Sequence, residues 1–119
     1  MTGPLDTVKK ALRAFADKDR TAIEAVIGEP YSFTSPHDNA LSRETFFERC
    51  WPNSAAFTEM NFIHGAEDGD LAFIVYEGVA NGKRFRNTEV HRVENGRIVE
   101  TEVYFGWNIP HEARPGGFV

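Results

Sequence analysis

The first third of the chain has a helical pattern of apolar residues. Pro4 suits the first turn of a helix, and the pattern after it ends near Asp17. The apolar positions recur at spacings of three and four: Leu5, Val8, Leu12 and Phe15. These positions lie on one face of a helix. The sequence therefore predicts an amphipathic helix that begins at Pro4.

Two shorter helices are predicted next. Asp19 can cap one helix, which the run Gly28-Glu29-Pro30 ends. Its apolar residues are Ile23, Val26 and Ile27. Ser42 can cap the other helix, which Pro52 ends after Trp51. Its apolar residues are Phe46, Phe47 and Cys50.

The remaining segments have the patterns of strands. Residues 31–35 alternate aromatic and polar side chains, so Tyr31, Phe33 and Ser35 face the same way, and residues 37–40 follow as a loop. Residues 57–65 and 71–79 are predicted as strands joined across Glu67-Asp68-Gly69. Asn81-Gly82 opens a last hairpin over residues 81–107.

The order of helix, helix, strand, helix and four antiparallel strands predicts an α+β fold, with helices on one face of the sheet. At 119 residues, the chain is expected to form one domain, with a core over residues 4–107 and an irregular tail over 108–119. Residues 71–76 are apolar on both faces of their strand. The helices can cover one face, so a second copy of the chain is expected to cover the other.

The last hairpin has a polar stripe. Asn87, Glu89 and His91 recur with a period of two and share a face with Phe85 and Val93, a mixture typical of a small-molecule pocket.

The register of this hairpin depends on its turn. A two-residue turn at Asn95-Gly96 sets Glu89 opposite Glu102, whereas a three-residue turn sets Glu89 opposite Thr101. Like charges directly opposed cost about 0.2–1 kcal/mol per pair, which favours the three-residue turn. That turn also places Val103 and Phe105 on the same face as Glu89.

Charge and composition exclude several classes of function. The net charge is −5 and no basic run exists, which argues against binding to nucleic acid. No run approaches the roughly 20 apolar residues of a membrane span, and the N-terminus lacks a signal-peptide pattern, so a cytoplasmic location is expected. Cys50 is the only cysteine and is predicted to be a buried structural thiol. Glycine-rich phosphate loops and Gly-x-Ser-x-Gly elbows are absent.

Several segments resemble the nuclear transport factor 2-like superfamily, and in particular its SnoaL-like members. The similarity covers about residues 5–107, and its most recognisable segments are Tyr76-Glu77-Gly78, residues 84–90, residues 95–98 and residues 103–107. The resemblance implies a cone-shaped barrel made by a strongly curved antiparallel sheet under three helices. It also implies an apolar interior and dimerisation through the convex face of the sheet. Members include isomerases, polyketide cyclases, epoxide hydrolases and proteins with no catalytic activity.

One member, ketosteroid isomerase, implies a specific comparison. Its pocket acid corresponds in position to Glu89, but its catalytic base falls at Ser35 and its hydrogen-bonding tyrosine near Ala11. Steroid isomerisation by that mechanism is therefore not expected.

The candidate catalytic residues are Glu89, His91 and Asn87. A carboxylate on an apolar wall is costly to ionise, which suits Glu89 to general acid–base work, and His91 lies one strand repeat further along. The structural alternative is that these side chains only satisfy one another. The residues expected to bind a small apolar or aromatic ligand are Tyr31, Phe33, Ser35, Phe46, Trp51, Phe62, His64, Phe73, Val75, Val103 and Phe105.

Three further residues are candidates for the pocket mouth: His37, Asp38 and Glu77. A metal site of His91, Glu89 and Glu77 lacks the ligand spacing of zinc motifs, so neither a metal nor a cofactor is predicted. Two functions remain open: a cofactor-free isomerase, cyclase or hydratase, and a dimeric binding protein without catalysis.

Overall fold

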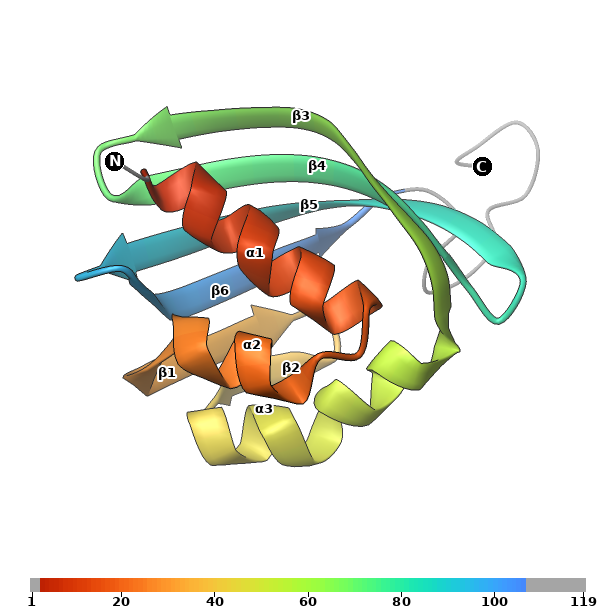
Figure 1. Ribbon diagram of the computed structural model, residues 1–119, viewed down its shortest axis with the longest axis horizontal. Helices are drawn as coiled ribbons and strands as arrows, with labels where there is room; N and C mark the ends of the chain where they lie inside the picture. The colour runs from red at the N-terminus through yellow and green to blue at the C-terminus, as the bar shows by residue number, and fades with distance from the viewer. Residues whose placement is uncertain (1–2, 107–119) are drawn as a thin grey trace, which may run out of the picture.

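The computed structural model describes residues 3–106, so Trp107 and the predicted irregular tail lie outside the described residues. The helices are α1 (Pro4–Ala16), α2 (Arg20–Val26), α3 (Arg43–Arg49) and the 3-10 helix η1 (Trp51–Ala56). The strands are β1 (Ile27–Ser35), β2 (Asp38–Leu41), β3 (Phe57–Asp68), β4 (Leu71–Ala80), β5 (Lys83–Glu94) and β6 (Arg97–Phe105). Figure 1 shows the helices packed over the concave side of a curved sheet.

The predicted caps begin α2 and α3. The Asp19 side chain accepts a hydrogen bond of 3.1 Å from the backbone N–H of Ala22, and Ser42 accepts one of 3.2 Å from Thr45. These bonds satisfy backbone N–H groups that have no partner within the helix. The α1 helix has Pro4 in its first turn, as predicted.

Two helix boundaries differ from the prediction. Ile27 was expected in the second helix, but it begins β1 and pairs with Ile98 of β6. Extended backbone suits this β-branched residue once a neighbouring strand is present. The third helix ends at Arg49, and the chain continues through Trp51 and Pro52 as a 3-10 turn.

The six strands form one sheet in the order β2-β1-β6-β5-β4-β3. The α+β class is confirmed, and the sheet is mixed because β1 runs parallel to β6. Residues 38–41, predicted mainly as loop, instead form β2 at the sheet edge and pair with β1. The pairing brings the N-terminal strand beside the last strand, and it could not be read from local patterns.

Two-residue turns join the long strands. The predicted turn at residues 67–69 was displaced, because Asp68 still pairs with Leu71 and the chain reverses at Gly69 and Asp70. The Asn81-Gly82 turn is as predicted, with φ values of 53° and 77°. Positive φ at both central residues matches the right-handed twist of the flanking strands.

The register of the last hairpin differs from both predicted alternatives. Asn95 and Gly96 form a two-residue turn with φ values of 54° and 76°. A bulge after the turn shifts the pairing, so that Glu89 pairs with Val103 and His91 with Thr101. The predicted three-residue turn is therefore wrong. The partner of Glu89 is Val103 and not the predicted Thr101, a shift of two residues along β6. Because side chains alternate with a period of two, this shift leaves the same β6 side chains on the Glu89 face, as predicted.

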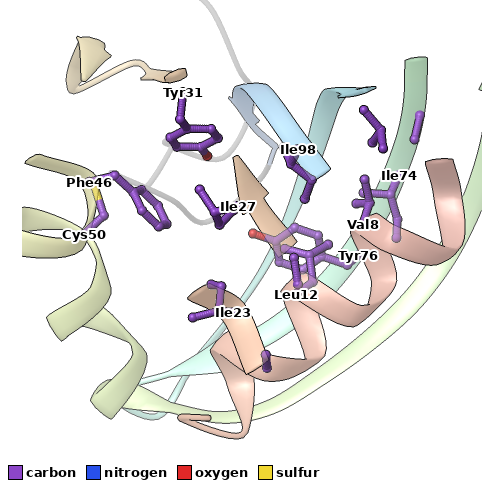
Figure 2. Close-up of a cluster of buried hydrophobic side chains, with 14 of the residues drawn as sticks. Val8, Leu12, Ile23, Ile27, Tyr31, Phe46, Cys50, Ile74, Tyr76 and Ile98 are labelled. Atoms are coloured by element: carbon purple, nitrogen blue, oxygen red, sulfur yellow. The ribbon is translucent and has the colours of Figure 1, made fainter. Parts of the chain in front are cut away.

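The hydrophobic core lies between the helices and the concave face. Val8 and Leu12 of α1 lie near Ile74 and Tyr76 of β4, and Figure 2 shows these side chains grouped together. Burial along β4 alternates, with Ile74 and Tyr76 buried and the intervening residues only half-buried. This alternation separates a concave face, which carries the core, from a convex face.

The convex face carries ion pairs. Arg84 contacts Glu59 at 3.0 Å and Glu77 at 3.4 Å, and Arg86 also pairs with Glu77. The pKa of Glu77 is lowered, chiefly by its hydrogen bond from Arg86. Tyr104 on the same face is 54% exposed.

Candidate functional site

A cavity of about 370 Å³ lies between the helices and the concave face of the sheet. This volume is within the range of small-molecule pockets, about 300–1,000 Å³. Buried apolar and aromatic side chains form most of its wall, among them Leu12, Ile23, Ile27, Phe46, Met60 and Phe85. More exposed residues surround its mouth: Ser35, His37, Asp38, Asn53 and Asn81.

Most residues chosen from the sequence line this cavity. The three candidate catalytic residues, Asn87, Glu89 and His91, are all buried in its wall. The candidate ligand-binding residues found there are Tyr31, Phe33, Ser35, Phe46, Val103 and Phe105. Figure 2 shows Tyr31 beside Phe46, whose ring centroid lies 5.4 Å from that of Tyr31.

Five of the predicted ligand-binding residues do not line the cavity, which corrects the prediction, and three of them are Trp51, Phe62 and His64. Trp51 packs outside it against Phe15, with ring centroids 5.7 Å apart. Phe62 lies under the Arg13 guanidinium at 4.9 Å, and His64 is exposed. Phe62 pairs with Tyr76 and keeps the concave face, whereas a bulge between Phe62 and His64 turns His64 to the convex face, where it pairs with Val75.

Phe73, Val75 and Glu77 lie on the other side of the sheet, so their predicted place at the cavity is also wrong. Ile74 pairs with Glu89, and directly paired residues of an antiparallel sheet point to the same face. The neighbours of Ile74 on β4 must then point to the convex face. The sequence prediction assigned the wrong parity to β4.

Tyr76 and Thr101 were missed as site residues. A signal for Tyr76 was present, because the two-residue Asn81-Gly82 turn sets Tyr76 opposite Asn87. The favoured three-residue turn already placed Thr101 on the Glu89 face, and the bulge in the last hairpin moves its partner from Glu89 to His91.

A chain of hydrogen bonds connects the polar side chains of the wall. The Tyr76 hydroxyl donates to Oε2 of Glu89 at 2.8 Å and accepts from Nδ2 of Asn87 at 3.2 Å. Oε1 of Glu89 lies 2.8 Å from Nε2 of His91. Nδ1 of His91 lies 2.9 Å from Oγ1 of Thr101. Each of these residues is at least nine-tenths buried, so water competes little for the bonds.

Tyr31 fixes the direction of the hydrogens in this chain. Its hydroxyl donates to Oγ1 of Thr101 at 2.8 Å, which leaves the Thr101 hydrogen to point at Nδ1 of His91. A neutral imidazole with an acceptor at Nδ1 carries its proton on Nε2. His91 then donates to Glu89, as Tyr76 does from the other side. Each oxygen of the Glu89 carboxyl group therefore receives one hydrogen bond from the protein.

Burial keeps both tyrosines protonated. The pKa values of Tyr31 and Tyr76 are raised well above their ordinary value of 10.0, chiefly because burial disfavours the phenolate. The nearby charge of Glu89 raises both pKa values further. The two hydroxyls therefore act as hydrogen-bond donors throughout the physiological pH range.

The mouth carries a second polar group. The Ser35 hydroxyl donates to Oδ2 of Asp38 at 2.8 Å and accepts from the backbone N–H of His37 at 3.1 Å. The His37 ring contacts Phe105, with centroids 5.4 Å apart. The two loop residues chosen from the sequence therefore do reach the cavity.

Cys50 is buried at the cavity wall as a free thiol. Burial, followed by the charge of Asp38, raises its pKa to about 11. A thiol that stays protonated is a poor nucleophile. Within residues 3–106, no group of three or more His, Cys, Asp or Glu side chains is arranged to hold a metal ion.

Comparison with protein-family models gave no match. Comparison with curated proteins also gave no match. Solved structures are similar in fold. An NTF2-like protein from Cytophaga hutchinsonii ATCC 33406 superposes with a TM-score of 0.74 at 18% identity, over 89% of this chain and 92% of that chain. The chain has the nuclear transport factor 2-like fold.

Two structures with this fold have more specific names. A loop truncation variant of IdmH has a TM-score of 0.67 and 26% identity, over 84% of this chain and 90% of that chain. An LEH-like epoxide hydrolase from M. tuberculosis has a TM-score of 0.71 and 18% identity, over 87% of this chain and 82% of that chain. Such likeness identifies the fold and leaves the chemistry to be argued from the site. Among the helices described, none is long and apolar enough to cross a membrane.

Proposed function

We propose that this protein binds a small, largely apolar molecule in the cavity and transfers a proton to or from it without a cofactor. The observation that carries the proposal is the buried pair of Glu89 and His91 in the wall of the cavity. A carboxylate and an imidazole in contact, one of them within reach of a bound molecule, are the usual groups of general acid–base catalysis.

Glu89 is the proposed base. An ionised carboxylate has about four lone-pair positions, and His91 and Tyr76 occupy two of them. A remaining lone pair can take a proton from a C–H or O–H group of the bound molecule, and the bonding electrons stay on that molecule. The glutamic acid then returns the proton to another atom of the same molecule, which gives isomerisation, or to water.

His91 acts on the bound molecule through Glu89. Both ring nitrogens have protein partners, Glu89 on one side and Thr101 on the other. The proposed role of His91 is to hold the Glu89 carboxylate in place and to balance its charge during proton transfer. The proposed role of Asn87 is to orient a polar group of the ligand.

The same hydrogen bonds favour a second candidate function, a binding protein without catalysis. Both oxygens of Glu89 and both nitrogens of His91 already have partners, which is also the arrangement of a purely structural network. In that case the cavity binds its ligand and Glu89 never exchanges a proton with it. The two functions differ in whether an isosteric Glu89→Gln change abolishes proton transfer.

We also propose that two copies of the chain associate through the convex face. Phe73 and Val75 on this face are only half-buried within one chain, and Tyr104 is 54% exposed. Burial of these side chains against a second copy would remove apolar surface from water. Light scattering during size exclusion tests this, and a monomer at micromolar concentration would contradict it.

Proton abstraction can be tested with a general probe. In 5-nitrobenzisoxazole, a base removes the ring C–H proton while the N–O bond breaks, and the electrons end on oxygen as a coloured phenolate. The Glu89→Gln variant removes the base and keeps the shape of the side chain. Glu77→Gln on the convex face is the matched control, since it changes one carboxylate away from the cavity. Catalysis that is lost in Glu89→Gln and kept in Glu77→Gln supports the enzyme. Binding of the probe without catalysis supports the second candidate.

A further inference from the structure

The hydrogen-bond donors in the inner wall of the cavity are almost all used by the protein itself. Tyr76 donates to Glu89, and Tyr31 donates to Thr101. The Thr101 hydroxyl and the His91 Nε2–H are used in turn, as argued above. What remains is one hydrogen of the Asn87 amide and the Cys50 thiol, which is a weak donor.

Acceptors, in contrast, are left over. Oδ1 of Asn87 is buried and has no hydrogen-bond partner. Its orientation is fixed, because the Tyr76 hydrogen goes to Glu89 and the Tyr76 oxygen must therefore receive the Nδ2 side of the amide. Glu89 keeps two lone-pair positions and the Tyr31 oxygen keeps one. A buried acceptor without a partner costs about 1–3 kcal/mol, which a ligand donor would offset.

The charges around the cavity have one sign. Glu89 lies in its inner wall and Asp38 at its mouth. Among the described residues that line the cavity, none is Lys or Arg. An anionic ligand would lose its hydration without gaining a cationic partner, which is costly in a largely apolar cavity.

We propose that the ligand is a neutral ring molecule that presents a hydroxyl or N–H donor to Asn87 and Glu89, and that molecules bearing a carboxylate are rejected. This ligand class deepens the proposed function and rests on it for the idea that the cavity is a working site. The aromatic wall fits the ring, and the spare acceptors fit the donor.

Three probes of similar shape test the proposal by NMR titration of the isotope-labelled protein. Indole has an N–H donor, benzofuran replaces that N–H by an ether oxygen, and indole-2-carboxylate adds an anion. We expect indole to bind at least about fivefold more tightly than benzofuran, because benzofuran leaves Oδ1 of Asn87 unpartnered. Indole-2-carboxylate is expected to bind more weakly than either neutral probe.

Variants assign the preference to one side chain. In Asn87→Leu, the ratio of the affinities for indole and benzofuran should fall toward one. Asn61 is exposed and lies outside the cavity, so Asn61→Leu should keep the wild-type ratio. The comparison of probes on the wild-type protein needs no variant, so a folding defect in Asn87→Leu does not remove the test. Equal binding of indole and benzofuran, tighter binding of the carboxylate, or no binding of any probe would overturn the proposal. Equal binding would leave proton transfer at Glu89 standing, because the nitrobenzisoxazole assay measures that separately.

Discussion

Oε1 of Glu89 lies 2.8 Å from Nε2 of His91, and both side chains are buried in the wall of one cavity. The contact joins two residues that are two positions apart on β5, so the strand itself sets their spacing. A carboxylate and an imidazole are the side chains that most often serve in general acid–base catalysis. The hydrogen bonds around this pair give predictions that do not require the natural ligand.

The first prediction concerns the His91 tautomer. In the neutral form of the ring, long-range ¹⁵N NMR of the wild-type protein should show the proton on Nε2, because Thr101 donates to Nδ1 and Glu89 accepts from Nε2. Thr101→Val removes the donor to Nδ1 but keeps Glu89 as the acceptor from Nε2, so the Nε2 tautomer should remain while the ¹⁵N resonance of Nδ1 shifts with the loss of its hydrogen bond. A wild-type ring protonated on Nδ1 would show that the hydrogens run in the opposite direction.

Thr101→Val should also destabilise the fold by about 1–3 kcal/mol, since it leaves Nδ1 of His91 and the Tyr31 hydroxyl buried without partners. Urea unfolding measures the change. Thr88→Val on the convex side of β5 is the control, and a loss of similar size there would indicate a general strand effect.

A second prediction concerns alkaline pH. The unfolded chain releases tyrosine protons around pH 10.0, whereas burial raises the pKa of Tyr31 and Tyr76 in the folded protein. The stability from these groups is fully present below pH 10 and is lost as the pH rises above it, by about 1.4 kcal/mol per pH unit for each tyrosine. Tyr31→Phe should reduce this slope. Tyr104→Phe, at an exposed position, should leave it unchanged, and an unchanged slope in Tyr31→Phe would contradict the account.

A third prediction concerns the packing at Gly78. A Cβ atom at this position would lie 2.8 Å from the Phe85 ring and 3.1 Å from the Phe57 ring. The two rings contact each other and form part of the cavity wall. Gly78→Ala should therefore lower the free energy of unfolding by about 1–3 kcal/mol. Gly69→Ala is not a suitable control, because the φ of 63° at Gly69 would itself strain an alanine. Ala72→Gly is the comparison instead, because it measures what the loss of one methyl group costs at a buried position of β4. If Gly78→Ala unfolds at the same denaturant concentration as the wild-type protein, the predicted clash is contradicted.

The local features of this fold were predictable from the sequence because they depend on near neighbours in the chain. The caps at Asp19 and Ser42 and the Asn81-Gly82 turn each use residues within a few positions of one another. The parallel pairing of β1 with β6 joins Ser32 to Glu100, and no local pattern specifies such a contact. The edge strand β2 depends on β1 in the same way.

The candidate site was predictable where strict alternation holds. Asn87, Glu89 and His91 lie on a regular stretch of β5, so their shared face followed from the period of two. Phe73 and Val75 were misplaced because an apolar run has no polar face to set its parity. The bulge in β3 moved His64 away from the site, and the bulge in the last hairpin changed the partner of Thr101 from Glu89 to His91. A bulge leaves no clear mark in a single sequence.

The most direct measurement for the central claim is kcat/KM for 5-nitrobenzisoxazole with the wild-type protein, Glu89→Gln and Glu77→Gln. A positioned base contributes about 100-fold or more, so Glu89→Gln should lose at least that factor while Glu77→Gln stays within about twofold of wild type. Equal rates for wild type and Glu89→Gln would contradict proton transfer by Glu89.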